Sequence, residues 1–357
     1  MPKLFIPGPT DVNPEVLEAQ SQPMIGHRSQ ECVELIRGIQ PKLQQVFATE
    51  SRVFISTSSG TGLQEAAMRN CVSDRVLVGV CGAFGERWHQ VAIDNGLAAD
   101  RLDADWGTPN TPEQVRAALE SGSYDTLAIV HNETSTGVQN PVAEIAQQAR
   151  QINPDIVILI DAVSSAGGVE ILTDAWGLDV VLTSSQKCFA LPPGLSFAAV
   201  SDRALTRAEK VGHRGWYFDF LRMLRYHERS MTPATPAISL LYALEKQLDR
   251  MLSEGLANRY QRHQDMGDFT RTWGQEHFAL FAQAGARSNT VTTISNVHDV
   301  DIPALNQFLL DHGMQLANGY GPLKNKTFRI GHMGETTVAE LEELMQTIEL
   351  FLESHPA

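Results

Sequence analysis

Short runs of apolar, often β-branched residues alternate with longer amphipathic segments over the first two thirds of the chain. Runs of the first kind predict buried strands, and segments with apolar residues every three or four positions predict helices. The expected strands are 53–55, 75–80, 126–130, 156–160, 180–182 and 197–200. The expected helices are 63–72, 86–95, 112–119 and 143–152. This alternation predicts an α/β fold, in which helices wrap a mostly parallel sheet.

The pattern changes after about residue 236. A helical stretch covers residues 237–255 and continues over 260–277, followed by a strand at 290–294, a helix at 302–311, a hairpin at 314–330 and a final helix at 338–352. This order predicts a smaller C-terminal α+β domain. We therefore predict an N-terminal arm (1–18), a large domain (19–253) and a small domain (254–357), and we expect the long helix to join the domains.

The composition is that of a globular protein large enough for about two domains. Its 42 Asp and Glu residues outnumber its 28 Lys and Arg residues, which gives a net charge of −14. Since no basic block interrupts this acidity, we expect it to bind neither nucleic acid nor a membrane. Prolines break the apolar N-terminus, and the apolar runs are too short to span a bilayer, so we expect a cytoplasmic protein.

Neither cysteines nor histidines predict a metal site. The four cysteines, Cys32, Cys71, Cys81 and Cys188, show no Cys-x-x-Cys pairing, which also argues against a disulfide framework. The eleven histidines are scattered without the spacing of metal ligands. We therefore predict that the protein holds no metal.

Lys187 is the most informative single residue of the chain. It follows the strand at 180–182 and precedes apolar residues 188–191 and a Pro-Pro-Gly turn, so its ammonium group is hard to keep solvated. Desolvation lowers the pKa of a lysine and leaves a nucleophilic amine. Such an amine forms a Schiff base with an aldehyde, which suits an enzyme that uses pyridoxal phosphate. The simpler alternative is a lysine that extends its charged end to water.

Three other predicted strand ends carry residues that fit the same cofactor, because ligands of open α/β sheets bind beyond the carboxyl ends of the strands. Ser59-Gly60-Thr61 stands at the start of a predicted helix. It could bind a phosphate, or it could be an ordinary turn in which Ser or Thr caps the helix. Asp161 could cap a helix, bind magnesium or keep a pyridine nitrogen protonated. Phe84 could lie flat on a planar cofactor or belong to the core.

Together these residues resemble the class V (fold type I) pyridoxal-phosphate aminotransferases, and within them the alanine/serine–glyoxylate aminotransferase group. The resemblance covers nearly the whole chain. It rests on the order and spacing of Ser59-Gly60-Thr61, His-Asn-Glu-Thr-Ser-Thr-Gly at 131–137, Asp-Ala-Val-Ser-Ser at 161–165 and Ser-Gln-Lys at 185–187. The separation of 187 − 161 = 26 residues between the aspartate and the lysine also matches. The resemblance implies a seven-stranded sheet in the large domain.

The resemblance also implies a role for each matching residue. Lys187 would hold the cofactor aldehyde and then act as general acid and base, and Asp161 would pair with the pyridinium nitrogen. Phe84 would stack on the cofactor ring. The other cofactor contacts would come from a residue near the ring oxygen, Thr134, and from the phosphate cradle of Ser59, Gly60, Thr61 and Gln186.

Two motifs outside this core have matches in the family. A threonine before the long helix contacts the cofactor phosphate of the neighbouring subunit, which implies a homodimer with active sites at the subunit interface. We assign this role to Thr235, with Thr232 as the alternative. Arg329 lies on an apolar strand, where an unpaired guanidinium would be costly, so it needs an anion. The substrate α-carboxylate is the predicted partner, and a structural ion pair is the alternative.

The implied reaction is a ping-pong transamination between an amino acid and a 2-oxo acid. We expect alanine or serine as donor and glyoxylate or pyruvate as acceptor, with aspartate as the alternative donor and a lyase reaction as a weaker alternative. Aspartate would need a second cation, for which the candidates are Arg28, Arg214, Lys324 and Lys326. A cysteine desulfurase is disfavoured, because that class needs a cysteine in the C-terminal part and usually a histidine in place of Gln186.

Overall fold

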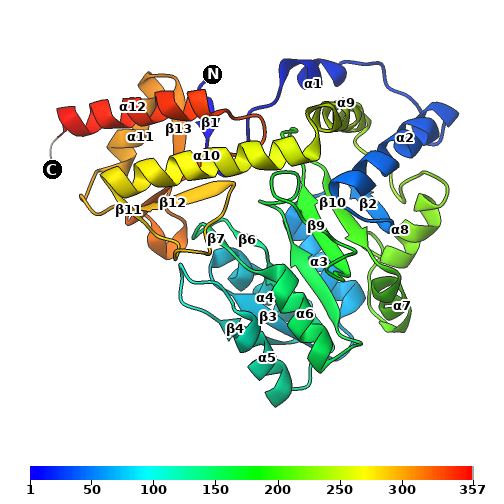
Figure 1. The fold of residues 1–357 in the computed structure, drawn as a ribbon. Coiled ribbons are helices and arrows are strands. Elements are labelled where there is room, and N and C mark those ends of the chain that lie inside the picture. The colour runs from blue at the N-terminus through cyan, green and yellow to red at the C-terminus, as the bar shows by residue number, and fades with distance from the viewer. Residues whose placement is uncertain (356–357) are drawn as a thin grey trace.

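The computed structural model describes residues 1–355, which fold around two main β-sheets (Figure 1). The larger sheet has seven strands in the order β2-β10-β9-β8-β5-β3-β4. Strand β10 runs antiparallel to both of its neighbours, whereas the other neighbouring pairs are parallel. The strands are β2 (Arg52–Ser56), β3 (Arg75–Val80), β4 (Ala98–Asp103), β5 (Thr126–Val130), β8 (Val157–Asp161), β9 (Val180–Ser184) and β10 (Ser196–Val200). The predicted α/β architecture is confirmed.

Strand β4 is the one strand of this sheet that the apolar pattern did not predict. It lies at the edge of the sheet, and its sequence Ala-Ala-Asp-Arg-Leu-Asp is half charged and partly exposed. Charged residues are common on edge strands, because they discourage pairing with further chains. The six predicted strands are present, with ends shifted by at most two residues, so that Asp161 is the last residue of β8.

Successive residues of the central strands point to opposite faces of the large sheet, so each face carries its own core. In β8, Ile158 and Ile160 join one core, and Val157 and Leu159 join the other. The helices that contribute most of the first core are α2 (Gln30–Val46), α5 (Pro112–Ser121), α6 (Val142–Ile152) and α9 (Ile238–Glu254). Those of the second are α3 (Gly60–Cys71), α4 (Ala83–Asp94), α7 (Asp202–Lys210) and α8 (Phe220–His227). The sheet is therefore buried on both faces.

The smaller sheet has five strands in the order β1-β13-β14-β12-β11. The predicted hairpin is confirmed, because β13 pairs antiparallel with β14. The strands are β1 (Lys3–Phe5), β11 (Ala279–Leu280), β12 (Val291–Ser295), β13 (Met314–Asn318) and β14 (Thr327–Gly331). The helices that pack on this sheet are α10 (Leu256–His277), α11 (Ile302–Asp311) and α12 (Val338–Ser354).

The N-terminal segment and the helical stretch differ from the expectation. Strand β1 pairs in parallel with β13, so the first residues join the smaller sheet, before α1 (Pro14–Ala19) packs beside α9 (Figure 1). Gly255, with a φ of 82°, separates α9 from α10, so two helices stand where one was expected. The domain boundaries at 18/19 and 253/254 stay a prediction. Within residues 1–355, no helix is long and apolar enough to cross a membrane.

Candidate active site

A cavity of about 250 Å³ brings most of the predicted site residues together. It lies at the carboxyl ends of the parallel strands, as expected for an open α/β sheet. The predicted residues that line it are Ser59, Gly60, Thr61, Phe84, Thr134, Asp161, Gln186 and Lys187. The residues that sequence reasoning missed are Gly8, Pro9, Gln64, Arg87, Val130, Asn132, Val163, Ser184 and Pro193.

Lys187 lies three residues beyond the end of β9 and is 9% exposed. Its Nζ donates a hydrogen bond to the carbonyl of Pro7, and its own carbonyl accepts one from Thr10 Oγ1 at 3.2 Å. Burial, together with the nearby charge of Arg329, lowers the pKa of Lys187 to about 8. A Cβ at Gly8 would lie 2.5 Å from Lys187 Cδ, so glycine is what allows the N-terminal segment to approach. The amine is therefore desolvated and held in place.

Asp161 is buried at the end of β8, where two donors hold its carboxylate. Oδ1 accepts from the backbone N–H of Val163 at 2.8 Å, and Oδ2 accepts from Gln64 Nε2 at 2.6 Å. Burial raises the pKa of Asp161 to about 6, while both hydrogen bonds and the charge of Lys187 lower it. Gln64 was missed because its signal, one polar residue among buried positions of a helix, is weak.

At the start of α3 the structure shows the capped turn, and the phosphate cradle stays a prediction. Ser59 is the N-cap residue and accepts a hydrogen bond from the N–H of Gly62 at 3.3 Å. A Cβ at Gly60 would lie 2.4 Å from Val163 Cγ2, so only glycine lets the helix start so close to the end of β8. The hydroxyls and the N-terminus of the helix form a favourable site for a phosphate.

Phe84 lies in the first turn of α4, which begins three residues before the predicted helix. The N-cap position is Gly82, which has no side chain, so the buried carboxylate of Glu133 takes its place. Glu133 Oε2 accepts from the N–H groups of Phe84 and Gly85, both at 3.1 Å. Burial raises the pKa of Glu133, which these hydrogen bonds oppose. Glu133 therefore orients the residue predicted to stack on the cofactor.

Arg329 lies on β14 and is 9% exposed. Its Nε donates to the carbonyl of Asn318 at 3.1 Å and its Nη1 to the carbonyl of Thr134 at 3.4 Å. No ion pair joins it to a carboxylate of residues 1–355, so within one chain the structure lacks the structural ion pair that was the alternative. Burial lowers the pKa of Arg329 to about 10, while Tyr320 and Glu133 raise it.

The comparisons with known proteins decide the family. The family model described as "Aminotransferase class-V" matches residues 4–343. The chain belongs to the class V aminotransferases. An uncharacterized aminotransferase of Methanocaldococcus jannaschii is 39% identical, over 98% of this chain and 92% of that protein. An alanine–glyoxylate aminotransferase structure from Nostoc sp. matches with a TM-score of 0.92 and 33% identity, over 98% of this chain and 95% of that one.

A subgroup IV aspartate aminotransferase structure from Thermus thermophilus is also similar. The TM-score is 0.91 and the identity 32%, over 99% of each chain. The predicted family and fold are thus confirmed, and as a member of its class this aminotransferase depends on pyridoxal phosphate.

The cavity of this class V aminotransferase fits that cofactor. An amine, a carboxylate, an aromatic ring and a helix N-terminus converge on one space. Three buried atoms on its wall, Gln64 Oε1, Asn132 Oδ1 and Ser184 Oγ, have no hydrogen-bond partner among the described residues. Buried polar atoms are rarely left unsatisfied, so the wall is suited to a bound polar group.

The cations proposed from sequence for a second carboxylate do not line the cavity. Arg28 donates to the carbonyl oxygens of Thr232 and Pro233, Arg214 pairs with Asp219, and Lys324 and Lys326 are exposed. Arg87 of α4 lines the cavity instead. Sequence reasoning missed it because its helical position alone does not show which way it points.

Thr235 and Thr232 lie outside the cavity. They share a separate small hollow with Thr57 and Tyr217. Thr232 Oγ1 donates to the carbonyl of Ala234 at 2.7 Å. Within one chain, the structure does not bring either threonine to the predicted phosphate cradle.

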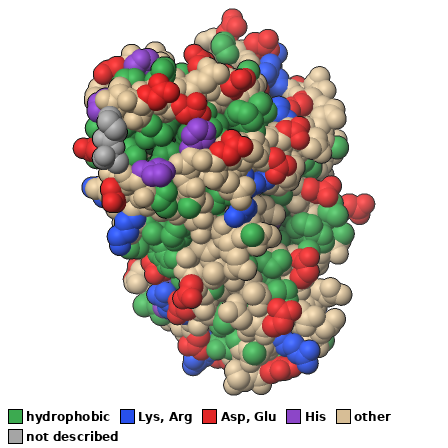
Figure 2. Space-filling model, turned by 60° about the vertical axis from the view of Figure 1, so that its left-hand side comes forward, with side chains coloured by type: hydrophobic (Ala, Val, Ile, Leu, Met, Phe, Trp, Pro, Cys, Tyr) green, Lys and Arg blue, Asp and Glu red, His purple; other side chains and the backbone are tan. Residues whose placement is uncertain are grey.

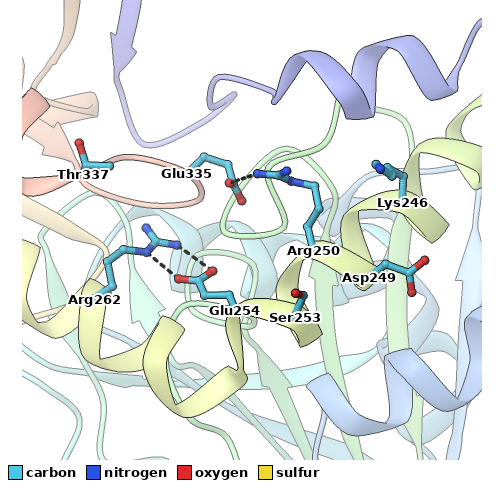
Figure 3. A pocket seen from close by; sticks show the side chains of 8 residues that line it. All are labelled: Lys246, Asp249, Arg250, Ser253, Glu254, Arg262, Glu335 and Thr337. Atoms are coloured by element: carbon cyan, nitrogen blue, oxygen red, sulfur yellow. Dashed lines mark hydrogen bonds and ion pairs between the residues drawn. The ribbon is translucent and has the colours of Figure 1, made fainter.

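A larger cavity, of about 550 Å³, lies between α9, α10 and the loop before α12 (Figure 3). Its charged groups all have ion-pair partners. Arg262 pairs with Glu254 at 2.7 Å and Arg250 with Glu335 at 3.2 Å, while Lys246 and Asp249 pair with Glu15 and Lys42 outside the cavity. Because these charges are already compensated, this cavity lacks the unpaired groups of the Lys187 cavity.

Histidines gather around a hollow near the end of the described chain (Figure 2). His277, His298 and His355 line this cavity of about 640 Å³. His298 bonds the backbone carbonyl of His277, and His277 faces Glu349 at 3.4 Å. Nowhere in the described residues does a group of three or more His, Cys, Asp or Glu side chains have the arrangement of a metal site.

Proposed function

We propose that this aminotransferase moves an amino group from a small amino acid, alanine or serine, to glyoxylate or pyruvate by a ping-pong mechanism. The observation that carries the proposal is Arg329, a buried guanidinium without a carboxylate partner among residues 1–355, beside a cavity that holds a desolvated lysine. An amino acid supplies one carboxylate and one amino group for these two residues. The similar Nostoc enzyme is named for alanine and glyoxylate, which supports a small donor.

Pyridoxal phosphate, when bound, supplies an aldehyde carbon and an electron-withdrawing ring. Lys187 would carry the proton between the substrate α-carbon and the cofactor, because its pKa of about 8 lets the amine accept and release protons near neutral pH. The carboxylate of Asp161 would hold a proton on the ring nitrogen, and Gln64 and Val163 keep that carboxylate oriented.

The remaining residues would bind and orient. Phe84 would cover one face of the ring, and Thr134 would donate near the ring oxygen. The phosphate would be held by Ser59, Gly60, Thr61 and Gln186. Arg329 would bind the α-carboxylate of the substrate, and its Nη2 nitrogen, which has no acceptor among residues 1–355, is available for this bond.

We propose a homodimer in which Thr235 contacts the cofactor phosphate of the partner. Support comes from its position, since Thr235 lies outside the cavity of its own chain. Thr235→Val should weaken cofactor retention severalfold, measured by equilibrium dialysis of pyridoxal phosphate, because a hydrogen bond to a charged group is lost. Unchanged retention would contradict the contact.

We also propose a cytoplasmic location, because the four cysteines are free and buried.

Aspartate is the second candidate donor, and Arg87 is the observation that favours it. Its guanidinium lines the cavity and forms no ion pair with a carboxylate of the described residues. The side-chain carboxylate of aspartate would suit such a group.

A half-reaction panel tests the proposal. The holoenzyme is mixed with alanine, serine, aspartate or glutamate, and the loss of the cofactor's absorbance near the visible edge is followed. We expect alanine and serine to convert the cofactor fastest. Conversion by aspartate alone would overturn the proposed donor and establish the second candidate.

A further inference from the structure

Tyr320 connects the two halves of the molecule beside the cofactor cavity. It lies between β13 and the short 3-10 turn Gly321–Leu323. Its position in this loop is tightly defined, because a Cβ at Gly319 would lie 2.0 Å from the carbonyl oxygen of Leu323. The loop belongs to the smaller sheet, yet its aromatic side chain contacts helix α4, which packs on the larger sheet.

Two residues of α4 meet this side chain. The ring centroids of Tyr320 and Phe84 are 5.5 Å apart, with an interplanar angle of 33°. Arg87 Nη2 donates a hydrogen bond to Tyr320 Oη at 2.8 Å. The guanidinium of Arg87 also lies 4.7 Å from the centre of the Phe84 ring.

The third contact comes from the smaller sheet itself. The guanidinium carbon of Arg329 lies 5.5 Å from the centre of the Tyr320 ring. Tyr320 therefore touches both residues that define the position of a substrate: Arg329, which would bind the α-carboxylate, and Phe84, which would cover the cofactor ring. Phe84 lines the cavity, and a substrate held between Phe84 and Arg329 would place its side chain near Tyr320.

We propose that Tyr320 determines donor specificity: its ring limits the space for the substrate side chain, and its hydroxyl holds Arg87 away from a second carboxylate. Small uncharged donors are thereby favoured over dicarboxylic ones. This inference rests on the proposed function, in which Arg329 binds the α-carboxylate.

Through Arg87, Tyr320 would select donors by the charge of their side chain as well as by its size. Its other polar contact is a long one, from Nη1 to Thr61 Oγ1 at 3.5 Å. The bond to Tyr320 Oη is thus the main restraint on the guanidinium. Arg87 already lines the cavity. Without that hydroxyl its guanidinium would be released from Tyr320, and the second carboxylate of a dicarboxylic donor would pair with it.

The test compares Tyr320→Ala and Tyr320→Phe with the wild-type holoenzyme. The ratio of kcat/KM for aspartate to kcat/KM for alanine should rise about ten- to a hundredfold in Tyr320→Ala, since a charge-assisted hydrogen bond is gained. Tyr320→Phe keeps the ring and releases only Arg87, so its ratio should rise less. The double variant Tyr320→Ala/Arg87→Gln should lose the gain for aspartate.

Equilibrium binding supplies a readout that does not depend on turnover. Succinate and propionate resemble aspartate and alanine but lack the amino group, so they bind without reacting. Calorimetric titration should show tighter succinate binding, relative to propionate, in both Tyr320→Ala and Tyr320→Phe. The substitution Arg87→Gln should cancel this gain in either background.

The outcomes separate this inference from the proposed function. If wild type uses alanine and Tyr320→Ala keeps the wild-type donor ratio, or loses both donors equally, the role of Tyr320 is overturned and the proposed function stands. If wild type converts aspartate alone, the proposed function fails. Should Tyr320→Ala not fold, an unchanged preference for propionate in Tyr320→Phe overturns the inference.

Discussion

Arg259 and Arg329 are both buried arginines, but their charges are compensated in opposite ways. Arg259 is 1% exposed and donates to Glu254 at 2.7 Å, to Glu335 at 3.3 Å and to the carbonyls of Gly167 and Cys188. Arg329 donates to two backbone carbonyls, without an ion pair to any described carboxylate. A buried charge without a partner lowers the stability of the folded protein. We therefore expect such a charge to be kept where a ligand of opposite charge binds to it.

The comparison also assigns a different task to each arginine. The bond from Arg259 to Cys188 ties α10 to the residue that follows Lys187, so Arg259 supports the loop that carries the reactive amine. Arg329 leaves donors for a substrate. The pairing of a buried charge therefore distinguishes a structural arginine from a ligand-binding one, which sequence position alone does not do.

The largest expected effect comes from removing the amine of Lys187, which Arg259 supports through Cys188 and which lies near Arg329. Lys187→Ala should lower the rate of alanine transamination by about 10⁴-fold or more, because it removes the covalent anchor and the general acid and base. Steady-state assays with alanine and glyoxylate measure it. Lys326→Ala, which changes an exposed lysine, serves as the control and should keep the wild-type rate.

Replacing Arg329 tests the functional side of the comparison. Arg329→Met should lower kcat/KM for alanine about a hundredfold, since charge-assisted hydrogen bonds to the α-carboxylate are lost. The free energy of unfolding should stay the same or rise, because an unpaired buried charge is replaced by an apolar chain. Urea denaturation of the apoenzyme measures the second quantity. A marked loss of stability would show that Arg329 is structural.

Replacing Arg259 tests the structural side. Arg259→Met should lower the free energy of unfolding by about 3 kcal/mol, because two carboxylates and two carbonyls lose a buried donor. The exposed pair Arg116–Glu120 provides the control, and Arg116→Met should change stability by less than about 0.5 kcal/mol. Stability equal to that of the Arg116 variant would mean that the two arginines do not differ as described.

The last prediction concerns how the stability of the apoenzyme depends on pH. Burial lowers the pKa of Lys187 from 10.5 to about 8. Between these values the unfolded chain binds a proton that the folded apoenzyme lacks, so the contribution of Lys187 to the free energy of unfolding rises with pH. The free energy of unfolding of wild type minus that of Lys187→Met should therefore increase by about 3 kcal/mol as the pH rises through this window. A flat or falling difference would contradict the desolvation of the amine.

The pattern of apolar and polar residues predicts the ends of a helix or strand where those ends depend on residues nearby in the chain. Helix α11 and strands β3 and β5 have the predicted ends, because apolar runs there meet polar or turn residues. The start of α4 was missed because its cap is Glu133, which lies about fifty positions later in the chain. Edge strand β4 was missed because it needs few apolar residues.

The same distinction holds at the site. Lys187, Asp161 and Phe84 lie at or just after the carboxyl ends of strands that share one edge of the sheet, so topology brings them together. Gly8, Gln64, Arg87 and Tyr320 matter through contacts between distant segments, and no local spacing indicates such contacts. Thr235 belongs to a third kind, because its predicted partner lies in another subunit.

Peptide mapping after borohydride reduction tests the central claim most directly. Borohydride fixes the cofactor covalently to the lysine that holds its aldehyde carbon, and mass spectrometry of the digested holoenzyme identifies that lysine. The account predicts a single modified position, Lys187, and no modification in Lys187→Ala. A cofactor fixed to any other lysine would contradict the assignment of this cavity as the active site.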